Sequence, residues 1–86
     1  MPSRHVVVRV PDGLHARPVA ELVRLAQAHQ LPVTLTTDAG ATVDLGSVLA
    51  VMDLGLASGD EVRLDTPASP AAERLLDRLS AVLDPA

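Results

Sequence analysis

The sequence predicts a two-layer α+β domain, in which helices cover one side of a mainly antiparallel sheet. Strand and helix patterns follow one another in the order β-α-β-β-α-β-α, and each strand pattern carries a single apolar face. A strand with one apolar face needs covering on that side only, which places the helices together. The order of the strands within the sheet stays open. Because no repeat or linker divides the chain, residues 1–86 are expected to form a single domain.

The first strand is expected over residues 5–10, where Val6, Val8 and Val10 share one side. The segment Pro11-Asp12-Gly13 predicts a turn. From Ala16 onward, apolar residues recur at helical spacing, and Pro32 is expected to close this helix. The apolar stripe consists of Val19, Leu22, Val23 and Ala26.

The middle of the chain predicts a hairpin followed by a short helix. Residues 33–37 and 42–44 have strand patterns, and the turn residues 38–40 separate them. Ser47 can cap a helix that runs to Leu54, because its hydroxyl can accept a hydrogen bond from an unpaired amide. Gly55 can end that helix.

The last part of the chain predicts a fourth strand and a terminal helix. Charged and apolar residues alternate over residues 61–65, as expected for a half-buried strand. Ser69-Pro70 has the pattern of a cap and first turn, and Pro85 marks the end of the helix. The apolar stripe of this helix consists of Leu75, Leu76, Leu79, Val82 and Leu83.

Composition excludes several classes of function. A net charge of −4 and the absence of aromatic residues argue against nucleic-acid binding. The absence of cysteine excludes disulfides and thiolate metal sites, and the three histidines have no His-x-x-x-His spacing, so we expect no metal and no cofactor. There is no signal-peptide pattern and no apolar run long enough to cross a bilayer. We therefore expect a cytoplasmic monomer without membrane insertion.

The segment Gly13-Leu14-His15-Ala16-Arg17-Pro18 carries the chemistry. Pro18 fits the first turn of a helix, where amides without partners and the positive end of the dipole attract phosphate. Arg17 can add charge-assisted hydrogen bonds to such an anion. The imidazole of His15 is a nitrogen nucleophile that is largely neutral near pH 7. The alternative is that these residues form only a solvated helix cap.

Together with residues 46–56 and 59–62, this segment resembles the HPr family of histidine-containing phosphocarrier proteins over nearly the whole chain. The resemblance implies an open-faced sandwich of four strands covered by three helices. It also implies that His15 accepts a phosphoryl group from enzyme I, which phosphoenolpyruvate charges, and passes it to enzyme IIA or other sugar-specific enzyme II components. Arg17 and the amides of Ala16 and Arg17 would hold the phosphoryl oxygens. Such a protein is a carrier and not an enzyme.

The resemblance also implies roles for residues outside this segment. Ser47 is either only a helix cap or also a regulatory phosphosite for a serine kinase/phosphorylase, which would control binding to a transcription regulator. Arg24, Val48 and Leu49 are candidates for partner docking, and for Val48 and Leu49 core packing is equally open. The alternative functions are a regulatory binding protein of the same fold, a phosphocarrier of a nitrogen-related or dihydroxyacetone-kinase branch, and a non-catalytic anion-binding domain.

Overall fold

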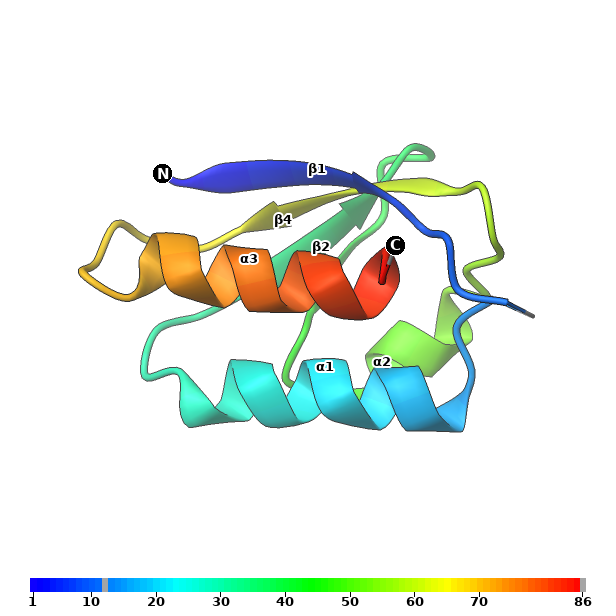
Figure 1. Cartoon of the computed structure of the whole chain (residues 1–86), viewed down its shortest axis with the longest axis horizontal. Coiled ribbons are helices and arrows are strands. Elements are labelled where there is room, and N and C mark those ends of the chain that lie inside the picture. The colour runs from blue at the N-terminus through cyan, green and yellow to red at the C-terminus, as the bar shows by residue number, and fades with distance from the viewer. Residues whose placement is uncertain (12, 86) are drawn as a thin grey trace.

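The computed structural model describes residues 1–11 and 13–85. Over these residues it contains a four-stranded sheet and three helices, in the predicted order. The elements are β1 (Ser3–Val7), α1 (Ala16–Ala28), β2 (Thr34–Thr37), β3 (Thr42–Asp44), α2 (Val48–Asp53), β4 (Glu61–Asp65) and α3 (Ala72–Leu83). The strands lie in the order β1-β4-β2-β3, every pairing is antiparallel, and all three helices lie on one side of the sheet (Figure 1). The predicted α+β open-faced sandwich is confirmed.

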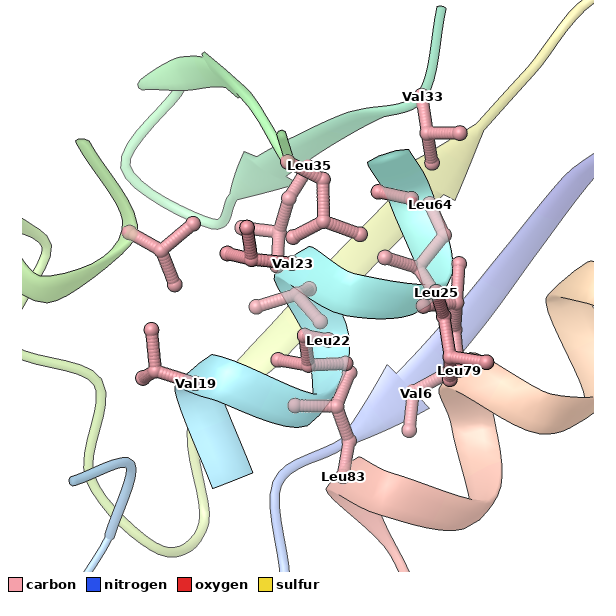
Figure 2. Packing of buried hydrophobic residues seen from close by; sticks show 14 of the residues in the cluster. Val6, Val19, Leu22, Val23, Leu25, Val33, Leu35, Leu64, Leu79 and Leu83 are labelled. Atoms are coloured by element: carbon pink, nitrogen blue, oxygen red, sulfur yellow. The ribbon is translucent and has the colours of Figure 1, made fainter. Parts of the chain in front are cut away.

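The core lies between the sheet and the helices and consists of aliphatic side chains. Figure 2 shows Leu22 and Leu25 of α1 and Leu79 and Leu83 of α3 packed with residues of the sheet. Because there are no aromatic rings to fill this space, tight packing depends on many small contacts. The largest fully buried residues are Leu22, Leu35, Leu45, Leu64, Leu76, Leu79 and Leu83.

The first strand is shorter than predicted, because the chain leaves the sheet after Val7. The amide of Val8 donates to the Asp60 carbonyl at 2.8 Å, and the amide of Arg9 donates to the Leu83 carbonyl at the end of α3 at 2.8 Å. Val8 is still fully buried and Val10 partly buried, so the valine pattern indicates burial beyond the strand. In the predicted turn at residues 11–13, Asp12 lies outside the described residues, and the amide of Gly13 donates to the Val10 carbonyl at 3.0 Å.

Two predicted helix ends were wrong. Helix α1 ends at Ala28 and not at Pro32, because His29 has an extended backbone and its amide turns back to Ala26. Helix α3 has Ala71 and not Ser69 as its N-cap, without a capping side chain. Ser69 contributes only its carbonyl, which accepts from the amide of Ala72 at 3.2 Å. Prolines and serines at these positions lie in the connecting segments, just outside the helices.

Strand β1, at one edge of the sheet, is tied to α3 by an ion-pair cluster. Arg4 lies on the helix side of β1, and its guanidinium contacts Glu73 at 3.0 Å and Asp77 at 2.7 Å. These carboxylates are four residues apart and therefore lie on the same face of α3. Arg4 thus connects the N-terminal strand to the C-terminal helix. No helix among the described residues is long and apolar enough to cross a membrane.

Asp65, at the end of β4, makes the stability of the fold depend on pH. Burial of the carboxylate raises the pKa of Asp65, but hydrogen bonds from the Ser3 hydroxyl and from Arg63 Nε outweigh this effect and leave that pKa below its usual value. A carboxyl whose pKa is lowered by folding stabilises the native state above its unfolded pKa. That contribution is lost as the pH falls through the lowered folded pKa.

We therefore expect Asp65→Asn to lower the free energy of unfolding by about 1 kcal/mol at pH 7 and to flatten its decrease in acid. Urea unfolding from pH 7 down to about pH 2 measures both effects. The matched control is Asp38→Asn in the β2–β3 turn, which removes a carboxylate that makes no hydrogen bond with the described residues. If the free energy of unfolding falls equally steeply with decreasing pH in both variants, Asp65 is not the source of the pH dependence.

Candidate functional site

His15 is the N-cap of α1, and its side chain remains free. Its backbone is extended, with φ −120° and ψ −171°, and its carbonyl accepts the first helical hydrogen bond from the amide of Val19 at 3.1 Å. The imidazole makes no capping hydrogen bond and is exposed. His15 is therefore held by its main chain, while its side chain is exposed at the helix start.

The loop before His15 is seated on the segment that connects α2 to β4. The amide of Leu14 donates to the Leu56 carbonyl at 3.0 Å. Gly13 has φ +75°, a backbone conformation that favours glycine, and a Cβ at this position would lie 2.8 Å from the same Leu56 oxygen. Only glycine therefore allows the two backbones to approach this closely, and the contact sets the position of His15.

The first turn of α1 presents donors for an anion. The amides of Ala16 and Arg17 have no acceptor among the described residues, and Pro18 has no N–H. Arg17 is exposed, and no carboxylate of residues 1–11 or 13–85 lies within ion-pair distance of it. His15, Ala16, Arg17 and Pro18 line an open hollow of about 810 Å³. Free amides, the positive end of the helix and a free guanidinium together suit a phosphoryl group.

Arg24 lines the same hollow as His15 and Arg17, two turns further along α1. It is held by Glu21, with contacts of 3.1 Å from Nε and 2.5 Å from Nη2 to the two carboxylate oxygens. These hydrogen bonds lower the pKa of Glu21 and raise that of Arg24. Arg24 therefore presents a fixed ion pair at this surface, in contrast to the free charge of Arg17.

Ser47 caps α2, as predicted. Its hydroxyl accepts from the amide of Ala50 at 3.2 Å. The preceding residue is tied to α1, because Gln27 Nε2 donates to the Gly46 carbonyl at 2.9 Å. Gln27 is twelve residues after His15, which corresponds to about 18 Å along the helix. Ser47 therefore lies toward the other end of α1, and it does not line the hollow beside His15.

Helix α2 turns an apolar face outward. Val48, Leu49 and Met52 are 49%, 76% and 42% exposed, whereas Val51 on the same helix is buried. The question of core packing or exposure, which the sequence left open, is thus decided in favour of exposure. Helix α2 packs against α1, so this apolar patch and the His15 hollow lie on neighbouring helices.

Two contacts that hold these segments in place could not be predicted from the sequence, namely the hydrogen bonds from the Leu14 amide to the Leu56 carbonyl and from Gln27 Nε2 to the Gly46 carbonyl. Both join residues far apart in the chain, and neither a backbone carbonyl nor a helix glutamine has a local signature. The candidate residues divide into two groups, with His15, Ala16, Arg17 and Arg24 at one hollow and Ser47, Val48 and Leu49 on α2. No three His, Cys, Asp or Glu side chains within the described part of the chain gather to hold a metal ion.

Comparisons with known proteins agree with this geometry. The family model described as "PTS HPr component phosphorylation site" matches residues 2–84. Phosphocarrier protein HPr of Streptomyces coelicolor is 41% identical over 83 residues, covering 96% of this chain and 88% of that protein.

Solved structures show the same likeness. HPr of Bacillus anthracis superposes with a TM-score of 0.86 at 30% identity, covering 96% of each chain. The catabolite repression containing protein Crh of Bacillus subtilis, described as an intertwined dimer with a swapped domain, has a TM-score of 0.72 at 32% identity and covers 99% of this chain and 95% of its own. The match of the family model over nearly the whole length, together with these relatives, shows that the chain belongs to the HPr family of phosphocarrier proteins of the phosphotransferase system.

Proposed function

We propose that His15 is the residue that carries the phosphoryl group, which it accepts from enzyme I and passes to enzyme IIA components of sugar uptake. The observation that supports this is the exposed imidazole at the start of α1, beside two amides and the guanidinium of Arg17, which have no partner within residues 1–11 and 13–85. A nucleophile and a cradle for an anion are thus neighbours. The family supports a phosphocarrier role in general. The geometry favours this histidine, because His5 lies within β1 and His29 follows the end of α1, so neither stands beside the amides of a helix start.

The chemistry is an in-line transfer of the phosphoryl group from a residue of enzyme I to His15, and then from His15 to a histidine or cysteine of the enzyme II component. The lone pair of Nδ1 of neutral His15 attacks phosphorus, a nitrogen–phosphorus bond forms, and the bond from phosphorus to the donor residue of enzyme I breaks. The other ring nitrogen keeps its proton. Charge is spread over the phosphoryl oxygens as the bonds exchange, and Arg17 with the amides of Ala16 and Arg17 stabilises it. The protein itself makes no product, since the second transfer restores the free imidazole.

Intact mass after incubation with phosphoenolpyruvate and enzyme I tests this role. One added phosphoryl group is expected, it should be lost after brief acid treatment, and His15→Ala should gain none. His29→Ala is the matched control, because it removes a different imidazole and should be labelled normally. Normal labelling of folded His15→Ala would contradict the assignment to this residue.

A second proposed role is regulation through Ser47. Two observations favour it: the similarity to Crh, a protein named for catabolite repression, and the exposed Val48 and Leu49 beside the serine. A phosphate there would add about −1.5 to −2 charges at a helix N-terminus, which the fold tolerates but a docking surface formed with Arg24, Val48 and Leu49 would not. A serine kinase/phosphorylase and a transcription regulator would then be partners.

The labelling experiment with enzyme I also separates the two roles. If enzyme I labels a known carrier but not this protein, regulatory binding becomes the better assignment.

A further inference from the structure

We propose that the junction between the end of α1 and the start of α3 is a second anion site, which binds a small organic phosphate monoester. This inference does not depend on the proposed role of His15. The two helices pack against each other in opposite directions, so the C-terminal end of α1 lies beside the N-terminal end of α3 (Figure 1). His29, at the far end of α1, is about 20 Å from His15 along a helix of 13 residues, and Arg24 between them lines both hollows.

The first observation is a hollow with positive lining. It has a volume of about 170 Å³ and is lined by Arg24 and His29 from the α1 side and by Arg74 and Arg78 from α3, together with apolar residues. No carboxylate lines it. In a chain with a net charge of −4, three arginines converge here on a space free of acidic side chains. Such an arrangement favours an anion over a cation or a neutral ligand.

The second observation is that the two arginines of α3 make no ion pair with the described residues, although Glu21 lies near enough to Arg78 for that charge to lower the pKa of Glu21. Arg24 is neutralised by Glu21, whereas neither Arg74 nor Arg78 has a carboxylate within ion-pair distance among the described residues. Glu73, which lies beside Arg74 in sequence, is turned away to Arg4 on β1. Arg74 and Arg78 are four residues apart and share a face of α3. Together they can hold the two charges of a phosphate monoester.

The third observation is a pair of buried donors without partners. His29 Nε2 and Ser69 Oγ are both inaccessible to solvent, and neither makes a hydrogen bond. Leaving such a group unpaired costs about 1–3 kcal/mol, so buried polar atoms in native proteins normally have a partner. His29 lines the arginine hollow and also an adjoining hollow of about 540 Å³, which Ser69 lines as well. Because both atoms are covered in this structure, they can pair with a bound oxygen only after the His29 and Ser69 side chains turn toward the hollows.

The adjoining hollow suggests what the ligand carries besides phosphate. Its other lining residues include Leu31, Pro70 and Ala71, which offer apolar surface directly beside His29. A phosphate on Arg74 and Arg78 would thus have room for an organic group over Leu31 and Pro70. The combined chemistry is that of a phosphate monoester with an apolar or aromatic group, and not that of a bare anion.

The test is an NMR titration of the labelled protein with phenyl phosphate, inorganic phosphate and phenol. Phenyl phosphate is expected to cause saturable changes in the chemical shifts of the amides of residues 71–75 and of the His29 ring. Inorganic phosphate should bind more weakly, and phenol should not bind. The double variant Arg74→Gln/Arg78→Gln should lose about tenfold in affinity. Arg63→Gln, on the opposite face of the sheet, is the matched control and should bind as the wild type does.

The cradle at His15 also attracts phosphate, so the two sites must be separated. Arg17→Ala should weaken the shifts at residues 15–17 and leave those at residues 71–75 unchanged. The proposal is overturned if residues 71–75 show no saturable shift, or if the α3 double variant, with an intact wild-type spectrum elsewhere, binds as tightly as Arg63→Gln. Equal affinity for inorganic phosphate would overturn the assignment to a monoester.

Discussion

Gly13→Ala is expected to lower the free energy of unfolding by about 2–4 kcal/mol and to slow phosphorylation of His15. Two costs add in this variant. An L-residue at φ +75° is strained by about 1–2 kcal/mol, and the new Cβ would lie 2.8 Å from the Leu56 carbonyl oxygen and 3.1 Å from Ala57 Cα. Both neighbours are backbone atoms, so the loop must move away and lose the hydrogen bond from Leu14 to Leu56. Urea unfolding and the initial rate of labelling by enzyme I measure the two effects.

Gly40→Ala separates these costs. Gly40 also has a positive φ, +91°, but nothing lies within 4 Å of its Cβ position. It therefore reports the backbone strain alone, about 1–2 kcal/mol, and should leave the rate of labelling unchanged. If Gly13→Ala is no less stable than Gly40→Ala, the close contact between the loop before His15 and Leu56 does not contribute to the stability of the fold.

Arg17→Ala is expected to slow phosphoryl transfer by roughly 100-fold while changing the free energy of unfolding by no more than about 0.5 kcal/mol. The side chain is exposed and makes no ion pair with the described residues, so little stability depends on it. It is, however, the guanidinium beside His15, and in the proposed transfer its charge stabilises the negative charge that spreads over the phosphoryl oxygens. Rapid-quench transfer from labelled enzyme I measures the rate constant.

Arg24→Ala provides the comparison, because Arg24 lines the same hollow but is neutralised by Glu21. We expect this variant to weaken docking of enzyme I, with an increased KM and a nearly unchanged rate constant at saturation. An Arg17→Ala protein that is folded and transfers at the wild-type rate would show that the backbone amides suffice for the chemistry.

Elements with a clear period were predictable from the sequence, but an end that depends on contacts with distant residues was not. The alternation at residues 61–65 corresponds to β4 as observed, and the hairpin from Thr34 to Asp44 has its turn at the expected residues. By contrast, β1 stops at Val7 because the amides of Val8 and Arg9 find acceptors at Asp60 and Leu83. Those acceptors are more than 50 residues away, and no local pattern contains them.

The candidate site was predictable to the extent that it is local. His15 and Arg17 are near neighbours in sequence, and the start of a helix has a recognisable signature, so their meeting needed no tertiary information. The exposure of Val48 and Leu49 could not be predicted, because a helix of six residues with apolar side chains all round has no distinguishable buried face. The loop contact at Leu56 and the link from Gln27 to Gly46 depend on the packing of whole elements.

The pairing of β1 with β4 has a consequence for synthesis on the ribosome. Residues 3–7 emerge first, but their partners at residues 61–65 emerge among the last elements, and Leu56, which seats the loop before His15, precedes them only slightly. A nascent chain shorter than about 65 residues therefore has an unpaired first strand and an unsupported loop before His15, and long-range pairings of this kind form late. Residues 13–18 therefore reach the geometry seen here only after residues 56–65 have been made.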